Sequence, residues 1–241
     1  MATNHRLFVD TELAHSKVVV LDEKASHYLS RVLRLRDGAT VTLFNGDGNN
    51  YAASLLKPDK KAAELSVTHV APGIDSTPRL HLATALLKGD KLDLVLQKAT
   101  ELDVTNIWLT HTSRCELRLT EKRKTNRMLH WQRIIISACE QSGRTRIPVL
   151  HPPQPLADVL DKTENSVRYS LEPSAAAGAI DVETRDVCLF SGPEGGFDTD
   201  EAQLLRRKTT SVQLGELILR AETAPLVGLA LLGAARRAST T

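Results

Sequence analysis

Residues 187–228 read VCLFSGPEGGFDTDEAQLLRRKTTSVQLGELILRAETAPLVG and carry the strongest structural pattern of this 241-residue chain. The stretch opens with four consecutive apolar residues, 187–190, which predict a short strand buried on both faces. Residues 191–196 follow with three glycines, which can adopt positive φ angles and let a ligand approach the backbone. This combination indicates a strand that ends in a ligand-accessible turn.

The remainder of the stretch repeats this arrangement. Asp198 and Glu201 have the spacing of a capping box, which predicts a helix over residues 199–208. Residues 212–214 predict a second short strand that ends at a glycine. Residues 223–225 predict the start of another helix, because proline is tolerated in a first turn. Ligands of α/β proteins bind beyond the carboxyl ends of strands, so two such turns in succession favour a ligand site over glycines that serve turns alone.

The chain before residue 79 has a different pattern. It predicts a small β-rich unit with one helix, residues 22–33, that can close into a barrel. The expected strands are 7–9, 18–21, 41–44, 51–56 and 65–70. Residues 71–78, which contain two prolines and a glycine, form the clearest linker. We therefore expect two domains, residues 1–72 and 73–241.

From Arg79 onward, strands and helices alternate. The expected strands are 80–86, 107–109, 149–150, 167–171 and 187–190, and the expected helices are 90–102, 122–141 and 156–160 in addition to those named above. Alternation at this spacing predicts an α/β domain with a mainly parallel sheet and helices on both faces.

Composition excludes several classes of protein. Apolar residues make up 41% and charged residues 25% of the chain, as in ordinary globular proteins, and no run of 18 apolar residues predicts a membrane span. The start of the chain lacks the apolar core of a secretory signal, so we expect a cytoplasmic protein. Cys115, Cys139 and Cys188 are widely spaced and predict reduced thiols, and no histidine spacing indicates a metal site.

The net charge is only +2, but the basic residues are clustered. Between Arg114 and Arg133 there are seven lysines and arginines against two acids. Smaller clusters are Arg31, Arg34 and Arg36 in the first domain and Arg144 with Arg146 in the second. Single runs of this kind are usually solvated surface, whereas three on a nearly neutral chain favour an extended anionic partner.

Several of these motifs together resemble a known family. GPEGGF and LGELILRAETAP in the 187–228 stretch are similar to the signature of the SPOUT-class RNA methyltransferases. Within that class the chain most resembles the ribosomal RNA small subunit methyltransferase E family, which methylates N3 of a uridine in 16S rRNA. Further matches are QKATELDV at 97–104, WQRIIISACEQSGR at 131–144, and HRLFV and HYLSRVLRLRDG near the N-terminus. Asp103 departs from the family pattern, which has glycine at this expected helix end, and must tolerate a left-handed conformation.

The resemblance implies a fold and partners that periodicity alone cannot show. It implies a trefoil-knotted SPOUT domain at residues 73–241, a PUA-like RNA-binding β-barrel at 1–72, and a homodimer. S-adenosylmethionine is the implied cofactor, and 16S rRNA or the small ribosomal subunit is the implied partner. The alternatives are another SPOUT RNA methyltransferase, which modifies a different base or a ribose, and a non-catalytic RNA-binding or ribosome-assembly protein.

Backbone groups in tight loops can read adenine without side chains, and small residues leave room for it. The expected cofactor contacts are Leu189, Ser191, Gly192, Pro193, Glu194, Gly195, Gly196, Leu214, Gly215, Leu217, Ile218, Leu219, Ala221, Thr223 and Ala224. The expected RNA contacts are Arg6, Arg31, Arg34, Arg36, Arg118, Arg123 and Arg144.

Methylation of uracil N3 requires loss of the ring proton, because the neutral nitrogen is a poor nucleophile. A carboxylate base, or cations that stabilise negative charge on the flanking carbonyl oxygens, would meet this need. Glu194 and Glu222 are the candidate bases or orienting groups, and Arg220 and Arg114 are the candidate oxyanion stabilisers. For Glu194 a structural role in the loop is an equal alternative. For Arg220 the alternative is a buried ion pair with Glu222.

Overall fold

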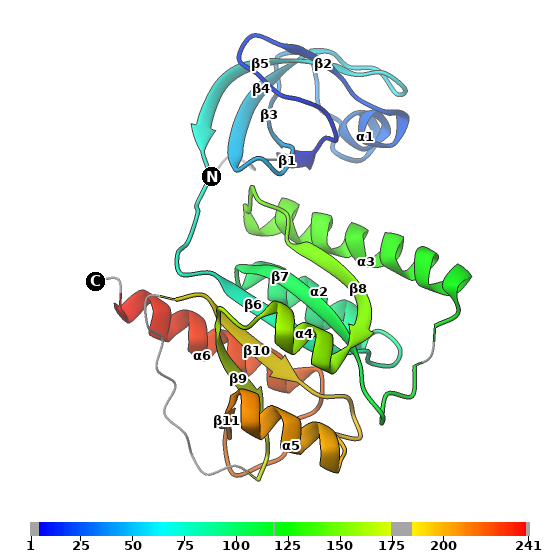
Figure 1. The fold of residues 1–241 in the computed structure, drawn as a ribbon. Coiled ribbons are helices and arrows are strands. Elements are labelled where there is room, and N and C mark those ends of the chain that lie inside the picture. The colour runs from blue at the N-terminus through cyan, green and yellow to red at the C-terminus, as the bar shows by residue number, and fades with distance from the viewer. Residues whose placement is uncertain (1–4, 118, 175–184, 240–241) are drawn as a thin grey trace. The chain divides into compact units, whose positions relative to one another are not determined.

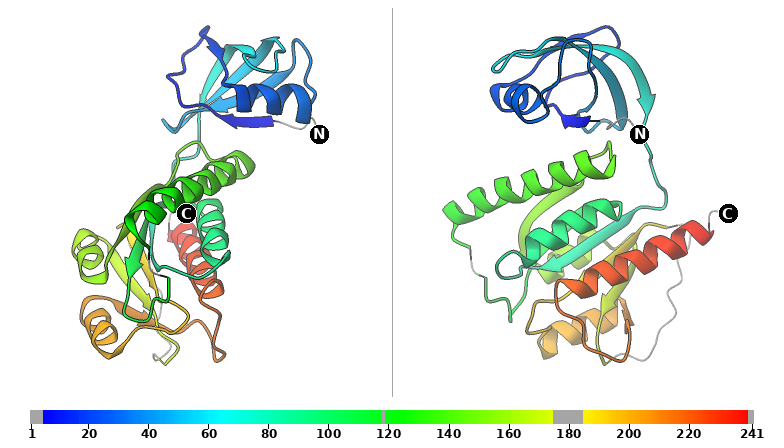
Figure 2. Two further views of the ribbon diagram at one scale, coloured as in Figure 1. Left: turned by 90° about the vertical axis from the view of Figure 1, so that its right-hand side faces the viewer. Right: turned by 180° about the vertical axis from the view of Figure 1, so that it is seen from behind.

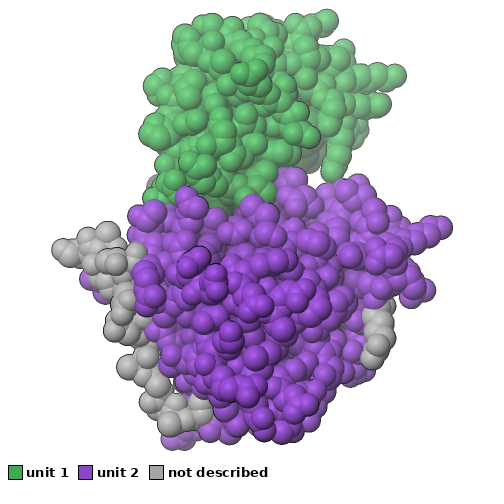
Figure 3. Space-filling view, in the orientation of Figure 1, with its two compact units in different colours: residues 1–75, 139–147 green, residues 76–138, 148–241 purple. Residues whose placement is uncertain are grey.

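The computed structural model describes residues 5–117, 119–174 and 185–239 of the chain. The chain divides into two compact units, 1–75 with 139–147 and 76–138 with 148–241 (Figure 3). The sequence placed the boundary at 72/73 and did not assign 139–147 to the first unit. That segment belongs there because Arg6 Nη2 donates to the carbonyl of Arg144 at 3.2 Å and the backbone N–H of Phe8 donates to Glu140 at 3.1 Å.

The first unit is built on a curved five-stranded sheet in the order β1-β3-β4-β5-β2 (Figure 1). Its strands are β1 (His5–Phe8), β2 (Val18–Val20), β3 (Thr40–Phe44), β4 (Asn49–Lys57) and β5 (Glu64–Pro72). The β1 and β3 strands pair in parallel, and the other pairs are antiparallel. Alternate residues of these strands fill the core, where Val41, Leu43 and Leu65 are fully buried.

The expected helix over residues 22–33 is present but changes type midway. The Asp22 side chain caps α1 (Glu23–His27) by accepting the Ala25 N–H at 2.7 Å. The following turn, η1 (Tyr28–Val32), is a π-helix, in which the Leu33 N–H reaches the Tyr28 carbonyl. A wider turn of this kind displays its side chains at a different angle from an α-helix.

The second unit contains a six-stranded sheet in the order β11-β9-β10-β6-β7-β8. Its strands are β6 (Leu80–Ala85), β7 (Val104–His111), β8 (Val149–Pro155), β9 (Val167–Leu171), β10 (Val187–Ser191) and β11 (Thr210–Val212). All of the described strand pairs in this sheet are parallel. Parallel sheets are covered on both faces, which explains the continuous apolar run in β10, where all five residues are buried.

Helices cover both faces of this sheet, as the alternation predicted (Figure 2). The helices are α2 (Lys91–Glu101), α3 (Glu121–Ser142), α4 (Leu156–Lys162), α5 (Thr199–Lys208) and α6 (Thr223–Ser239). Helices α2 and α6 pack together on one face and α4 and α5 lie on the other. The capping box of α5 is confirmed, since Asp198 accepts the Glu201 N–H at 2.8 Å and Glu201 accepts the Asp198 N–H at 3.0 Å. Asp90 stands at the N-cap of α2, but its side chain makes no capping hydrogen bond.

One expectation about the C-terminal region is corrected. The second strand is Thr210–Val212, not 212–214, because only these residues pair with β9. In α6, a Cβ on Gly228 would lie 2.8 Å from Leu189 Cδ2 of β10. Gly228 therefore lets α6 approach the sheet. The left-handed conformation expected at Asp103 is confirmed by its φ of 68°.

Cys115, Cys139 and Cys188 are free and buried, as expected. Within residues 5–117, 119–174 and 185–239, no helix is long and apolar enough to span a bilayer. In the same part of the chain no group of three or more metal-ligating side chains is found.

Candidate functional site

A cavity of about 630 Å³ lies at the carboxyl edge of the second unit's sheet. Its walls come mainly from the three loops that follow β9, β10 and β11, which are neighbours in the sheet. Parallel strands bring their carboxyl ends to one edge, so segments 40 residues apart in sequence meet there. The volume is in the range of small-molecule sites in proteins.

The cavity is lined by most of the residues expected to contact a cofactor. These are Ser191, Gly192, Pro193, Glu194, Gly195, Gly196, Leu214, Gly215, Leu217, Ile218, Leu219, Ala221 and Ala224. Leu189 and Thr223 are absent from the wall, since Leu189 is 1% exposed within β10 and Thr223 begins α6.

Sequence reasoning missed one wall of the cavity. The loop after β9, residues 171–174, lines it, as do seven residues before and within α5: Phe197, Asp198, Thr199, Ala202, Gln203, Leu205 and Arg206. Glu172 of this loop forms an ion pair with Arg206 of α5, and the hydrogen bonds from Arg206 hold the pKa of Glu172 below its ordinary value. The sequence predicted the strand 167–171, but its place beside β10 follows from the strand order, which only the structure shows.

The loop after β10 depends on its small residues. A Cβ on Gly192 would lie 3.1 Å from the Phe197 ring, and one on Gly195 would lie 3.2 Å from Arg114 Cβ. Gly196 has a φ of 68°, a conformation that other residues rarely adopt. A side chain at 192 or 195 would therefore displace Phe197 or Arg114, and one at 196 would strain the backbone.

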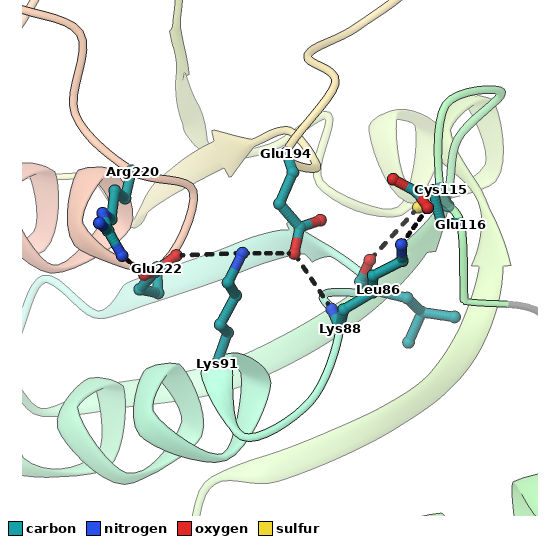
Figure 4. A network of polar contacts seen from close by, with 8 residues as sticks. All are labelled: Leu86, Lys88, Lys91, Cys115, Glu116, Glu194, Arg220 and Glu222. Carbon is teal, nitrogen blue, oxygen red and sulfur yellow. Dashed lines mark hydrogen bonds and ion pairs between the residues drawn. The ribbon is translucent and has the colours of Figure 1, made fainter.

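A network of charged residues joins this loop to α2 and to the start of α6 (Figure 4). Lys91 Nζ lies 2.9 Å from Glu194 Oε1 and 3.8 Å from Glu222 Oε2. The backbone N–H of Lys88 also donates to Glu194 Oε1 at 3.2 Å, and the Lys88 side chain pairs with Glu116. One ammonium group thus contacts carboxylates from two segments of the cavity region.

The environment of Glu194 favours its ionised form. Burial raises the pKa of this carboxyl, but the hydrogen bonds from Lys91 and from the backbone of Lys88 outweigh it, so the pKa of Glu194 lies below its ordinary value. A carboxylate held in this way is a weak base. The geometry therefore favours the structural role for Glu194 over the role of proton acceptor.

The other catalytic candidates lie around the same network. Arg220 Nη1 is 4.0 Å from Glu222 Oε1, and the Arg220 side chain is 84% exposed, so it is not a buried partner of Glu222. Arg114 lines the cavity and donates from Nη1 to the Gly195 carbonyl at 2.9 Å. Both guanidinium groups thus lie at the loops that form the cavity.

The expected RNA contacts fall into different environments. Arg31, Arg34 and Arg36 are exposed on the first unit, and Arg123 is exposed on α3. Arg6 is half-buried: it donates to Asn50 Oδ1 at 2.6 Å and to the Arg144 carbonyl, and its guanidinium lies over the Phe44 ring. These contacts show Arg6 tying β1 to the 139–147 segment. Arg118 lies outside the described residues.

Comparison with known proteins supplies the family. Residues 75–233 match the model of an RNA methyltransferase domain, and residues 21–68 match that of an RNA methyltransferase PUA domain. The ribosomal RNA small subunit methyltransferase E of Rickettsia conorii is 31% identical over 234 residues, which cover 94% of this chain and 93% of that protein. The protein of the same name from Synechocystis is 32% identical over 239 residues, which cover 95% of this chain and 77% of that protein.

Two solved structures superpose on nearly the whole chain. A protein from Legionella pneumophila, described as a methyltransferase with the bound cofactor SAM, has a TM-score of 0.90 and 32% identity, with 97% of this chain and 98% of that chain covered. The ribosomal RNA small subunit methyltransferase E of Neisseria gonorrhoeae, bound to S-adenosyl methionine, has a TM-score of 0.87 and 32% identity, with 96% and 97% covered. The chain therefore belongs to the ribosomal RNA small subunit methyltransferase E family.

Proposed function

We propose that this protein is an S-adenosylmethionine-dependent methyltransferase that methylates N3 of a uridine in 16S rRNA. The observation that carries the proposal is the cavity at the carboxyl ends of β9, β10 and β11, which small-residue loops line with backbone groups. Two relatives with the same fold over nearly their whole length bind S-adenosylmethionine. In this proposal the second unit, residues 76–138 with 148–241, forms the catalytic domain, with a trefoil knot, and the first unit, residues 1–75 with 139–147, forms an RNA-binding domain.

The residues present fit this cofactor. Glycine at 192 and 195 lets the loop after β10 pack closely against Phe197 and Arg114, and the backbone groups of such a loop can bind adenine. Leu214, Leu217 and Leu219 supply apolar wall, and Glu194 places a carboxylate near the cavity, which suits a positively charged ligand. When bound, S-adenosylmethionine supplies an electrophilic methyl group on a sulfonium.

The protein's own residues would act on the uracil ring. Loss of the N3 proton spreads negative charge onto the two flanking carbonyl oxygens, and a guanidinium stays charged at any working pH. Arg220, which is 84% exposed, can turn toward a bound base without leaving a buried partner uncompensated. Arg114 is tied to the Gly195 carbonyl and contributes positive charge from the loop after β7. Lys91 contacts Glu194 in the loop that holds Arg114 and also contacts Glu222, two residues after Arg220.

The first test is calorimetric titration with S-adenosylmethionine, followed by nucleoside mass spectrometry of rRNA from a deletion strain. We expect saturable binding at one site and the loss of a single N3-methyluridine from 16S rRNA. Loss of a different methylated nucleoside would identify another RNA methyltransferase. Absence of any binding heat would leave a non-catalytic RNA-binding protein.

We also propose that the protein is a cytoplasmic homodimer. Leu217 and Ile218, next to the cavity, are 84% and 83% exposed, and large apolar side chains side by side on a surface indicate a site of association. A second copy that covered them would enclose the cavity. Sedimentation equilibrium at micromolar concentration tests this, and a monomer there would contradict the proposal.

A further inference from the structure

We propose that helix α3 binds the phosphate backbone of the substrate RNA through a group of basic side chains that we call the α3 basic face. It is defined by four residues, Lys122, Arg123, Arg127 and Arg133. The inference rests on the proposed function, because it takes the substrate to be RNA, and it assigns to this helix the role of holding that RNA while a base occupies the cavity.

The charge of this face is not balanced by acids on the helix itself. From Lys122 to Cys139 the chain contains no aspartate or glutamate. Lys124, the fifth basic residue of this stretch, pairs with Glu121 at 3.8 Å. The four residues of the α3 basic face have no hydrogen-bonded or ionic partner within the described parts of the chain.

Asp93 of α2 contacts α3, but its carboxylate already has partners on that helix. Asp93 of α2 lies 2.7 Å from His130 Nε2 and accepts a hydrogen bond from Trp131 Nε1 at 3.1 Å. Trp131 and Ile135, on the inner side of the helix, are 1% and 0% exposed. The helix is thus anchored through its apolar side, while Lys122, Arg123 and Arg133 are exposed and Arg127 is partly exposed.

The spacing of the cations suits an extended polyanion. Lys122 and Arg133 lie on one line of the helix with Asn126 and Leu129, and Arg123 and Arg127 lie four residues apart on a neighbouring line. Lys122 and Arg133 are therefore about 16 Å apart along the axis. This length covers several successive phosphates of one nucleic-acid strand.

The chain connects this face to the cavity. Arg114 lines the cavity and is fastened to the Gly195 carbonyl at 2.9 Å. Glu121, the first residue of α3, comes seven residues later, and seven extended residues span at most about 25 Å. RNA that places a base in the cavity therefore has phosphates within reach of α3.

Other occupants fit the α3 basic face less well. A second copy on a two-fold axis would place the same cations opposite one another, which is repulsive. A membrane would need a strip of apolar side chains beside the cations, and Leu129, at 55%, is the large apolar residue of α3 that is exposed. Phosphates of RNA need only the cations, whose binding releases counterions.

The test compares two variants of the full chain that lose the same charge. Arg123→Ala/Arg127→Ala removes half of the α3 basic face, and Arg207→Ala/Lys208→Ala removes two exposed cations of α5 as the matched control. Affinity for a 16S rRNA transcript is measured by filter binding at several salt concentrations. We expect the slope of log K against log salt to fall by about 1.4 to 1.8 in the first variant and to stay unchanged in the control.

A second pair, Lys122→Ala/Arg133→Ala, should repeat the result, with S-adenosylmethionine affinity and thermal unfolding unchanged because alanine suits a helix. An unchanged slope in both α3 variants, or an equal loss in the α5 control, overturns the inference. The inference is also overturned if the α3 variants lose binding to phosphatidylserine vesicles while their binding to RNA stays unchanged. If the wild-type chain fails to methylate 16S rRNA while the α3 variants still lose slope, the proposed function fails and the RNA contact stands.

Discussion

Arg220 and Lys91 lie on either side of Glu222, but the structure gives them different surroundings. Arg220 is 84% exposed and at the limit of ion-pair distance from Glu222, whereas Lys91 is 37% exposed and contacts both Glu222 and Glu194. The buried oxygen of Glu222 therefore has its nearest charge in Lys91. This arrangement leaves Arg220 available to the substrate.

Arg220→Ala should lower kcat about 100-fold, the effect of removing one donor to a developing oxyanion, with little change in cofactor affinity. Methyl transfer to a 16S rRNA substrate and calorimetry with S-adenosylmethionine measure the two quantities. Arg220→Lys should recover little, because an ammonium lacks the planar fork of donors. A normal kcat in Arg220→Ala would remove this residue from the mechanism.

Lys91→Met should weaken binding of S-adenosylmethionine about fivefold, equal to about 1 kcal/mol, because the loop after β10 loses its tie to α2. The free energy of unfolding should fall by less than about 1 kcal/mol, since the pair is partly exposed. Lys98→Met is the matched control: Lys98 is on the same helix and pairs with Glu101 at 2.8 Å, away from the cavity. Equal affinities in the two variants would show that Lys91 does not position the loop.

The lowered pKa of Glu194 predicts a dependence of stability on pH. A carboxyl whose pKa is lower in the folded state stabilises the fold above its unfolded pKa, and this contribution is lost as the pH falls through the lowered folded value. Glu194→Gln should therefore be less stable than wild type near neutral pH, and the difference should shrink in acid. Urea unfolding at a series of pH values measures it. A difference that stays constant with pH would contradict the assigned interaction.

At the scale of elements, alanine substitutions at the two glycines of α6 distinguish the effect of close packing from that of helix propensity. A Cβ on Gly228 would lie 2.8 Å from the buried Leu189 side chain, whereas on Gly233 its nearest neighbours would lie at 3.7 and 3.8 Å. Gly228→Ala should destabilise the protein by about 1 kcal/mol, since overpacking exceeds the gain in helix propensity. Gly233→Ala should stabilise it by about 0.5–1 kcal/mol. Equal shifts in Tm for the two variants would refute the close contact of α6 with β10.

Sequence patterns predicted an element correctly where a few neighbouring residues determine it. The apolar run at 187–190 predicted a buried strand, and all five residues of β10 are buried, while the capping box at Asp198 predicted the start of α5 correctly. The β11 strand was placed two residues late, because its bounds depend on where β9 ends beside it. The π-helical turn at Tyr28–Val32 has no signal in helical periodicity.

At the scale of the whole molecule, the thiols report on global unfolding. Cys139 and Cys188 are 0% exposed and Cys115 is 7% exposed, and burial raises the pKa of Cys139 to about 11. Near neutral pH, Ellman's reagent should therefore react with all three only as fast as the protein opens. Reaction in denaturant gives the full count. Rapid modification of one thiol in the native protein would show local opening around it.

The sequence by itself determined the fold class, the two-part organisation, and the glycine loops, because apolar periodicity, turn residues and caps act over a few neighbouring positions. It did not reveal that Lys91 joins Glu194 to Glu222, that the loop after β9 completes the cavity, or that residues 139–147 belong with the first unit. Those contacts join residues many positions apart. They exist only once the sheet brings strand ends to one edge, so tertiary packing decided them.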